Sequence, residues 1–370
     1  MKKIITIIGA RPQFIKAAPV SRAFKKHGGV EEILVHTGQH YDANMSQVFF
    51  DELEIPAPRH NLEVGSAGHG GQTGEMLKRL EPLLVSEKPD AVLVYGDTNS
   101  TLAGALAAAK LNVPVGHVEA GLRSFNRKMP EEINRVVADH LSTFLFCPTK
   151  TAAANLKREG ITRNVFNTGD VMYDVAVLFA KKAKAGSAVL DALGLAPREY
   201  VLVTVHRAEN TDDKAALAGI LASLDRIASD VPVVFPMHPR TKKMVGSFGL
   251  GKFLKKITVT GPAGFLDMVR LESGAKLIVT DSGGVQKEAY FHKVPCVTLR
   301  AETEWVETVA AGWNRTPKDM TVESVLDAVE KMTGPNKKRK TIAEYGDGKA
   351  AEKIVKILVE RLRSWEEIDS

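Results

Sequence analysis

Residues 277–288 read Leu277-Ile-Val-Thr-Asp-Ser-Gly-Gly-Val-Gln-Lys-Glu288, an apolar strand that passes through a short turn into a helix. The first N–H groups of such a helix have no partner inside it, so an anion can accept hydrogen bonds from them. Gly283 and Gly284 carry no side chain that would keep a phosphate from the backbone, and Ser282 adds a hydroxyl donor. Glu288 lies one helical turn after Gly284, on the face where its carboxylate would accept ribose hydroxyls. The stretch predicts a nucleotide-diphosphate site in a parallel α/β domain. A plain strand-to-helix turn with Ser282 as N-cap is the alternative.

The composition is typical of two folded domains. The chain has 370 residues, of which 44% are hydrophobic and 25% are charged, enough for two cores. The formal net charge of +6 does not indicate a nucleic-acid partner, because Lys and Arg alternate with acids everywhere except residues 337–340. No apolar stretch approaches the roughly 20 residues that span a bilayer, so no membrane partner is expected.

The two cysteines, Cys147 and Cys296, lie inside apolar segments. Buried thiols are therefore expected in preference to a disulfide or a metal site. Reduced thiols fit a cytoplasmic protein. Met1-Lys-Lys followed by residues 4–8 imitates a signal peptide, but the apolar run is short and Arg11-Pro12 interrupts it. This run is expected to be the first strand.

Apolar strands alternate with helical patterns along the whole chain, which predicts an α/β fold with two doubly wound parallel sheets. Strands are expected at 4–8, 33–36, 91–95, 114–118 and 144–147, and then at 200–205, 231–235, 257–260, 277–280 and 294–299. Helices are expected at 44–53, 101–110, 149–158, 174–195, 321–332 and 350–363, and one begins at Pro130. Residues 65–74 are rich in Gly, Ser and His and are expected to form a loop, either over a site or on the surface.

Two cations follow the first strand in Gly9-Ala-Arg-Pro-Gln-Phe-Ile-Lys16. The segment lacks the Gly-x-Gly-x-x-Gly pattern, so dinucleotide binding is disfavoured. Open α/β sheets bind ligands at the carboxyl ends of their strands, and Arg11 and Lys16 at that edge suit an anionic ligand. A helix-start arginine with a solvated lysine is the alternative.

Three acids come from successive strand-to-helix connections. Asp97 follows strand 91–95, Glu119 follows strand 114–118, and Glu131 begins the next helix. In a doubly wound sheet these connections line one crevice, so the acids are expected to converge there for proton transfer. Each has a structural alternative: Asp97 as an N-cap, Glu119 as a partner of Arg123, and Glu131 as a favourable charge at a helix start.

Seven ordered motifs together resemble the non-hydrolysing UDP-N-acetylglucosamine 2-epimerases over nearly the whole chain. They are Gly9-Ala-Arg-Pro-Gln-Phe-Ile-Lys16, His36-Thr-Gly-Gln-His40, Tyr95-Gly-Asp-Thr98, His117-Val-Glu-Ala-Gly-Leu-Arg123, Pro130-Glu-Glu132, Val205-His-Arg-Ala-Glu-Asn210 and Asp281-Ser-Gly-Gly284. The resemblance implies a fold like the GT-B glycosyltransferases, in which two Rossmann-like domains face a central cleft. The expected boundaries are 1–168 for the first domain, 169–349 for the UDP-binding domain and 350–370 for a helix that crosses back to the first domain.

The resemblance also implies the chemistry. The family eliminates UDP from the sugar, forms 2-acetamidoglucal and adds UDP back to the other face, without a metal or nicotinamide cofactor. Proton transfer at C2 is then expected from Asp97, Glu119 and Glu131, with His206 beside the departing diphosphate. Substrate contacts are expected from Arg11, Lys16, Arg123, His238, Ala263, Met268, Ser282, Gly283, Gly284 and Glu288. A UDP-sugar is the expected partner, and a homodimer the expected assembly.

This chain departs from the family pattern at two places. Many relatives have Thr-Glu-Arg-Pro-Glu where this chain has Thr303-Glu-Trp-Val-Glu307, so Trp305 replaces a possible phosphate contact. Met268 stands where an aromatic residue usually borders the uracil. The Trp305 motif, the start of the chain and Ser124-Phe-Asn-Arg-Lys-Met129 resemble a branch that acts on UDP-2,3-diacetamido-2,3-dideoxyglucuronate. UDP-N-acetylglucosamine is ranked first as the commonest substrate of the family.

Two other classes share the same nucleotide site. A GT-B glycosyltransferase would pass the sugar to an acceptor, and a sensor would bind it without reaction. Three acids and a histidine favour proton transfer on the bound sugar over transfer to an acceptor. Turnover without an acceptor would separate the three classes.

Overall fold

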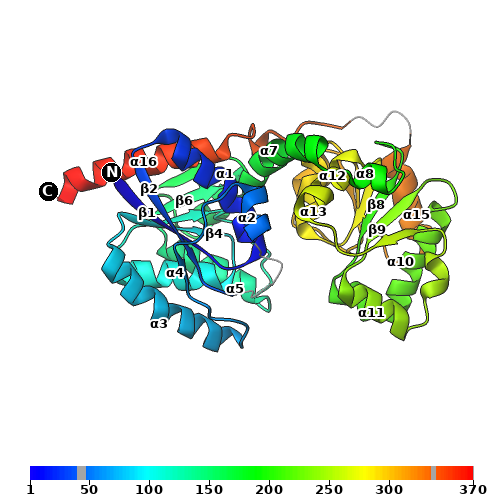
Figure 1. Cartoon of the computed structure of the whole chain (residues 1–370), viewed down its shortest axis with the longest axis horizontal. Coiled ribbons are helices and arrows are strands. Elements are labelled where there is room, and N and C mark those ends of the chain that lie inside the picture. Colours follow the sequence, from blue (N-terminus) through cyan, green and yellow to red (C-terminus); the bar gives the residue numbers. More distant parts are fainter. Residues whose placement is uncertain (40–46, 335–338, 370) are drawn as a thin grey trace. The chain divides into compact units, whose positions relative to one another are not determined.

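The computed structural model describes residues 1–39, 47–334 and 339–369. The chain divides into two compact units. Unit 1 comprises Met1–Val175 together with Ala343–Ser370, and unit 2 comprises Ala176–Ile342 (Figure 1). The C-terminal segment is therefore part of unit 1, far in sequence from the rest of that unit.

Unit 1 is built on a seven-stranded sheet in the order β3-β2-β1-β4-β5-β6-β7, and all its strand pairs are parallel. Its strands are β1 (Lys2–Ile8), β2 (Val30–His36), β3 (His60–Asn61), β4 (Ala91–Tyr95), β5 (Val115–Val118), β6 (Phe144–Cys147) and β7 (Val165–Asn167). Every residue of β4 and β6 is buried, as continuous apolar runs require when helices cover both faces of a sheet. The expected strands at 91–95 and 144–147 are confirmed.

Helices cover both faces of this sheet. They are α1 (Arg11–His27), α2 (Gln47–Leu53), α3 (His69–Glu87), α4 (Asn99–Lys110), α5 (Pro130–Leu141), α6 (Lys150–Arg158), α7 (Val171–Gly186), in which the boundary between the units falls, the 3-10 turn η2 (Ala343–Tyr345) and α16 (Ala350–Asp369). One apolar cluster joins α3, α4 and α5 to strands β1, β2, β4 and β5. Helices α1 and α16 pack together (Figure 1). A side chain on Gly116 of β5 would contact Leu358 of α16.

Unit 2 repeats the design with a six-stranded parallel sheet in the order β10-β9-β8-β11-β12-β13. Its strands are β8 (Val201–Thr204), β9 (Val233–Pro236), β10 (Thr258–Thr260), β11 (Leu277–Thr280), β12 (Cys296–Thr298) and β13 (Asn314–Arg315). The remaining elements are α8 (Val189–Ala192), α9 (Ala208–Thr211), α10 (Lys214–Ile227), α11 (Pro239–Ser247), η1 (Gly251–Leu254), α12 (Phe265–Gly274), α13 (Gly283–Phe291), α14 (Val306–Ala310) and α15 (Val322–Thr333).

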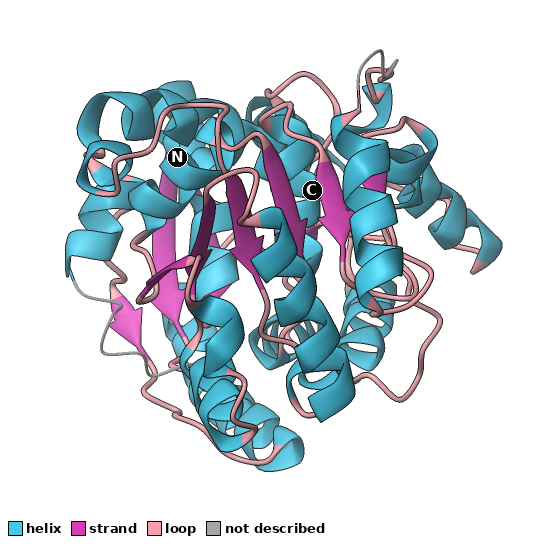
Figure 2. Ribbon diagram, turned by 90° about the vertical axis from the view of Figure 1, so that its right-hand side faces the viewer, coloured by secondary structure: helices cyan, strands magenta, loops and turns pink. Residues whose placement is uncertain are grey.

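Two apolar clusters lie on opposite faces of this second sheet. One packs α10, α11 and α15 against it, and the other packs α8, α12 and α13. Figure 2 shows strands lying between helices. The predicted α/β class with two Rossmann-like parallel sheets is confirmed. No helix in the described ranges is both long and apolar enough to cross a membrane.

Two expected elements differ from the structure, and a third is described only in part. Helix α3 begins at His69, so the loop expected at 65–74 is half helical, because buried Gln72, Met76, Leu80 and Leu84 hold one face of α3 despite its glycines. The pattern at 174–195 begins earlier and forms two helices, α7 and α8. Of the helix expected at 44–53, residues 47–53 form α2, and residues 44–46 lie outside the described residues, as does His40 of the quoted motif.

Candidate functional site

The candidate residues follow the strands at which each sheet changes direction. In unit 1 the order reverses between the neighbours β1 and β4, and in unit 2 between β8 and β11. Arg11 follows β1 and Asp97 follows β4, while His206 follows β8 and Ser282 follows β11. Ligands of open α/β sheets bind at this carboxyl edge, where connections leave in opposite directions and open a crevice.

Lys16 and Glu119 form an ion pair at the carboxyl edge of unit 1. Lys16 Nζ lies 2.7 Å from Glu119 Oε1, and their side chains are only 16% and 10% exposed. Glu119 follows β5 directly and adopts a φ of 74°, in the left-handed region that costs a non-glycine residue energy. A Cβ on Gly96, after β4, would lie 3.3 Å from Lys16 Nζ, so this pair sits against the β4 connection. The structure thus joins Lys16 to Glu119 rather than Glu119 to Arg123.

Asp97 pairs with an arginine that the sequence analysis did not assign. Arg135 on α5 donates to Asp97 Oδ2, and Asn134 Nδ2 donates to the Asp97 carbonyl oxygen at 3.0 Å. Arg135 also lies 3.1 Å from Glu132, whose buried carboxylate accepts bonds from Ser124 and Phe125. Burial alone would raise the pKa of Glu132, but the bonds from Ser124 and Phe125 bring it below its ordinary value. The sequence signal was the arginine one turn after the Glu131-Glu132 pair.

Glu131 and Arg11 are both exposed at the first turns of helices, α5 and α1. Among the described residues, none pairs with the Glu131 carboxylate through a hydrogen bond or ion pair. Its neighbour Glu132 is buried and accepts hydrogen bonds from the loop before α5. The Glu131 carboxylate is therefore accessible for chemistry.

Arg123 is a correction. It was expected to contact substrate, but its side chain is 1% exposed. Its guanidinium binds Asp139 at 2.6 Å and both oxygens of Glu159 at 2.7 Å. Two buried or partly buried carboxylates therefore satisfy this cation, and it has no exposed surface to offer a ligand. The positions that pair with it, 16 and 36 residues further along the chain, cannot be read from the local sequence.

In unit 2, Asp281 organises the connection that carries His206. Its carboxylate is fully buried and accepts bonds from the backbone N–H of His206 and Arg207 and from Asn210 Nδ2, at 2.9–3.1 Å. The His206 ring is 42% exposed, with Nδ1 3.6 Å from Asp281 Oδ1. Asp281 thus holds the backbone while the imidazole stays accessible. Asp281 begins the Asp281-Ser-Gly-Gly284 motif, but no local pattern in the sequence indicates this role.

Ser282 is the N-cap of α13 by position, but its hydroxyl makes no capping bond to the helix. The alternative interpretation, a serine that only caps, is therefore not what the geometry shows. Gly284 is exposed, and a Cβ there would meet only Ser282 Oγ, at 3.9 Å. A Cβ on Gly283 would instead lie 2.4 Å from Glu304 Oε1. The lack of a side chain therefore serves a different purpose at each position. At Gly283 it allows close packing, and at Gly284 it leaves the helix start open.

Trp305 packs beside the same helix start. Its indole Nε1–H donates to the Gly283 carbonyl oxygen at 2.8 Å, and the residue is 8% exposed. Lys287 Nζ lies 4.1 Å from the centre of its ring, a cation–π contact. Lys287 is itself buried. Trp305 therefore supports the first turn of α13 instead of presenting a charge.

Glu288 is partly exposed on α13, and a buried acid lies behind it. Glu272 on α12 is buried, and its pKa is well above the ordinary value because of burial and then the charge of Glu288. His292 Nε2 lies 3.8 Å from Glu272 Oε2, and burial lowers the pKa of His292 to about 4. A neutral Glu272 beside a neutral His292 is consistent with the raised pKa of Glu272 and the lowered pKa of His292.

The remaining expected contacts also lie in unit 2. His238 follows β9 and its Nδ1 accepts a bond from the Arg240 N–H at 3.2 Å, while its ring centre is 5.8 Å from that of His206. Burial, then the charges of His206 and Arg240, lower the pKa of His238. Ala263 and Met268 are partly buried against the apolar cluster of α12 and α13.

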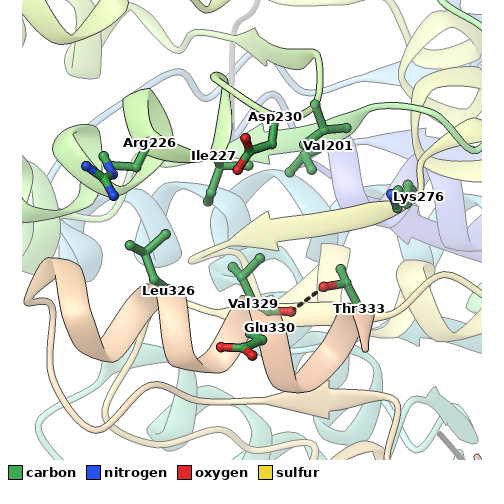
Figure 3. A pocket seen from close by; sticks show the side chains of 10 residues that line it. Val201, Arg226, Ile227, Asp230, Lys276, Leu326, Val329, Glu330 and Thr333 are labelled. Carbon is green, nitrogen blue, oxygen red and sulfur yellow. Dashed lines mark hydrogen bonds between the residues drawn. The ribbon is translucent and has the colours of Figure 1, made fainter. Parts of the chain in front are cut away.

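A cavity of about 390 Å³ lies elsewhere in unit 2 (Figure 3). Its lining includes Val201, the first residue of β8, and Lys276, which precedes β11. Both mark the amino edge of the sheet, opposite the edge that carries His206 and Ser282. The cavity is therefore not the candidate site. No group of three or more His, Cys, Asp or Glu residues suited to a metal occurs among the described residues.

Two doubly wound sheets, with acids at one switch point and an open helix start at the other, define a nucleotide-binding α/β enzyme fold. The family model described as UDP-N-acetylglucosamine 2-epimerase matches residues 22–359. The chain belongs to this family, as the motifs predicted.

Individual relatives match over almost their whole lengths. The chain is 54% identical to a "UDP-N-acetylglucosamine 2-epimerase homolog" of Methanococcus maripaludis, over 96% of this chain and 99% of the relative. It is 49% identical to a UDP-2,3-diacetamido-2,3-dideoxy-D-glucuronate 2-epimerase of Pseudomonas aeruginosa, over 96% and 99%. The Methanocaldococcus jannaschii UDP-GlcNAc 2-epimerase, solved with UDP-GlcNAc and UDP, is 47% identical with a TM-score of 0.85, over 97% of this chain and all of that one.

Proposed function

We propose that this chain interconverts UDP-N-acetylglucosamine and UDP-N-acetylmannosamine by eliminating UDP and adding it back after inversion at C2. The observation that carries the proposal is the acid cluster of unit 1. Asp97 and Glu119 follow neighbouring strands at the carboxyl edge, and Glu119 is paired at 2.7 Å with Lys16. Removing and returning a C2 proton requires such acid–base groups.

The proposed roles divide between the units. In unit 2 the open N–H groups after Ser282 and the Ser282 hydroxyl would hold the diphosphate, and Glu288 would accept the ribose hydroxyls. His206 would protonate or hydrogen-bond the diphosphate as it leaves, while Arg11 and Lys16 of unit 1 would stabilise its growing charge.

The reaction balances with these groups alone. A carboxylate among Asp97, Glu119 and Glu131 takes the C2 proton, the C1–O bond breaks, and UDP departs with the electron pair. The resulting 2-acetamidoglucal then receives a proton on the other face of C2 as the C1–O bond to UDP forms again.

Turnover in heavy water tests this proposal. The purified protein is incubated with UDP-N-acetylglucosamine and no acceptor, and the product is analysed by proton NMR and mass spectrometry. UDP-N-acetylmannosamine that carries solvent deuterium at C2 is expected. Epimerised product without deuterium would exclude the elimination route, and free sugar would indicate hydrolysis.

UDP-2,3-diacetamido-2,3-dideoxyglucuronate is the second candidate substrate. It is favoured by Trp305 at the family arginine position and by 49% identity to a relative named for that substrate. This sugar has a C6 carboxylate, which calls for an additional cation, and the candidates are Arg123, Arg127 and Lys128. Arg123 is too buried to supply it, whereas Arg127 and Lys128 are exposed. Proton NMR with each sugar nucleotide decides: a manno product from the diacetamido uronate alone would reverse the ranking.

We also propose a cytoplasmic homodimer. Cys147 and Cys296 are both free and buried, which fits a reducing compartment. Ile133 and Val137 lie one turn apart on α5 and are 46% and 36% exposed, an apolar stripe suited to a second copy. Light scattering of the purified chain should give twice the chain mass, and Val137→Lys should lower it.

A further inference from the structure

His117 is fully buried in the middle of unit 1, between two hydrogen-bond acceptors. Its Nε2 lies 2.7 Å from the Gly96 carbonyl oxygen, and its Nδ1 lies 2.7 Å from Asp139 Oδ1. A carbonyl oxygen cannot donate a proton, so Nε2 carries a hydrogen. If Asp139 is ionised, Nδ1 carries a hydrogen as well, and the ring is an imidazolium.

The surroundings of Asp139 favour its ionised form. Its second oxygen accepts bonds from the Arg123 guanidinium at 2.6 Å and from the Gly121 N–H at 3.1 Å. Burial alone would raise the pKa of Asp139, but the charges and hydrogen bonds of His117 and Arg123 bring it below its ordinary value. Hydrogen bonds donated to both oxygens stabilise the ionised form of a carboxylate.

The four charged side chains in this cluster have no net charge. The cations His117 and Arg123 face the anions Asp139 and Glu159, and the nearby Cys147 thiol is neutral, because burial raises its pKa to about 12. Buried ions persist when they are paired and hydrogen-bonded in this way.

The other end of His117 reaches the candidate site. Gly96 joins β4 to Asp97 and has a φ of 64°. Its N–H donates to the Val118 carbonyl at 3.0 Å, and its carbonyl accepts from His117, so both its peptide units are fixed. The Gly96 carbonyl belongs to the same peptide plane as the Asp97 N–H. The His117 bond therefore sets the direction in which Asp97 leaves the strand.

We propose that His117 is a positioning residue: Asp139 holds it as an imidazolium, and its Nε2–H fixes the Gly96–Asp97 peptide so that Asp97 is aimed at the substrate. The inference rests on the proposed function for the role of Asp97. The protonation state of His117 does not rest on it and can be measured alone.

The first test is nitrogen-15 NMR of the histidine rings in the wild-type protein. The His117 ring, assigned by its loss in His117→Gln, should show two protonated nitrogens. In Asp139→Asn the Asn Nδ2 donates to Nδ1, so the ring should become neutral with its proton on Nε2. A neutral ring in the wild type would overturn the imidazolium assignment, whatever the enzyme's activity.

The second test compares two substitutions of the same residue. Glutamine places its amide nitrogen near the position of Nε2 and keeps the donor to Gly96, whereas asparagine reaches only the position of Nδ1. His117→Asn should lose about 10²-fold in kcat from misplacement of a reacting group, and His117→Gln should lose much less. UDP affinity, measured by calorimetry, should be unchanged in both.

Asp139→Asn separates charge from position. It removes one negative charge together with the extra proton of His117, so the group stays balanced and the Nε2–H bond to Gly96 remains. It should therefore retain far more turnover than His117→Asn. Equal loss in Asp139→Asn and His117→Asn, or in His117→Gln and His117→Asn, with native circular dichroism in each, would overturn the positioning role. Inactive wild type with a charged His117 would instead count against the proposed function.

Discussion

The indole N–H of Trp305 donates a 2.8 Å hydrogen bond to the carbonyl oxygen of Gly283, the first residue of α13. The two residues are 22 positions apart in the chain. The loop after β12 thereby fixes the helix turn whose free N–H groups are proposed to bind the diphosphate. Trp305, which departs from the family pattern, therefore stabilises the backbone at the start of α13.

Trp305→Phe removes this hydrogen bond but keeps an aromatic ring for Lys287. The unfolding free energy should fall by about 1 kcal/mol, the usual net contribution of one hydrogen bond, and UDP affinity should also fall as the helix start loosens. Trp313→Phe is the matched control, because Trp313 Nε1 donates to the Lys340 carbonyl at 2.7 Å and its ring contacts Tyr290 in the last turn of α13, away from the start of that helix. Urea unfolding and calorimetry measure the two quantities. Equal UDP affinity in both variants would contradict the assigned role.

Alanine at the two neighbouring glycines should affect different properties, namely stability at Gly283 and UDP binding at Gly284. Gly283→Ala places a Cβ 2.4 Å from Glu304 Oε1, so the Glu304 side chain must move and give up its ion pair with Arg300, which should lower the unfolding free energy by up to about 1 kcal/mol. Gly284→Ala meets nothing closer than 3.9 Å and should leave the melting temperature unchanged while weakening UDP binding by blocking the helix start. Tight UDP binding by Gly284→Ala would place the diphosphate elsewhere.

Ser282→Ala and Glu288→Ala should each weaken UDP binding about tenfold or more. Each removes a direct bond to the diphosphate or ribose, and bonds to charged groups are worth roughly 1.5–3 kcal/mol. Ser273→Ala is a suitable control, since the Ser273 hydroxyl bonds to the Arg270 carbonyl within α12. Unchanged affinity in both site variants, measured by calorimetry, would exclude the proposed UDP site.

Glu119→Gln and Glu131→Gln should prevent deuterium from entering C2 in heavy water. Loss of an acid–base group typically lowers the rate by about 10²–10⁴-fold, and UDP binding should persist because these acids are assigned to the sugar. Glu75→Gln, a change at a partly exposed position on α3, should behave like wild type. Wild-type deuterium uptake by Glu131→Gln would remove that residue from the mechanism.

Glu272→Gln should make the fold more stable than wild type at high pH. The pKa of Glu272 is raised in the folded protein by burial and the charge of Glu288. Its contribution is therefore fully present below about pH 4.5, the unfolded value, and is lost as the pH rises through the folded pKa, by about 1.4 kcal/mol per pH unit. Chemical denaturation should show that the unfolding free energy of Glu272→Gln, relative to that of wild type, is greater at pH 9 than at pH 5. A constant difference would mean that Glu272 is already ionised at pH 5.

Much of the architecture was predictable because its signals are local. Apolar runs at 91–95 and 144–147 became β4 and β6 without change, since strands buried on both faces need uninterrupted apolar residues. Helix α3 was not predicted, because three glycines near its start suggest a loop, and only its packed face against the first sheet outweighs that preference.

The sequence by itself determined two parallel α/β sheets and placed Arg11, Asp97, Glu119, His206 and Ser282 at strand ends, because chain order and right-handed crossovers bring successive connections to one edge. Only the tertiary structure decided which charges meet. Lys16 pairs with Glu119 across 103 residues, while Arg123, four residues from Glu119, turns inward to Asp139 and Glu159. Ion pairs depend on distances of a few ångströms and on burial, and these arise only when separate strands and helices pack.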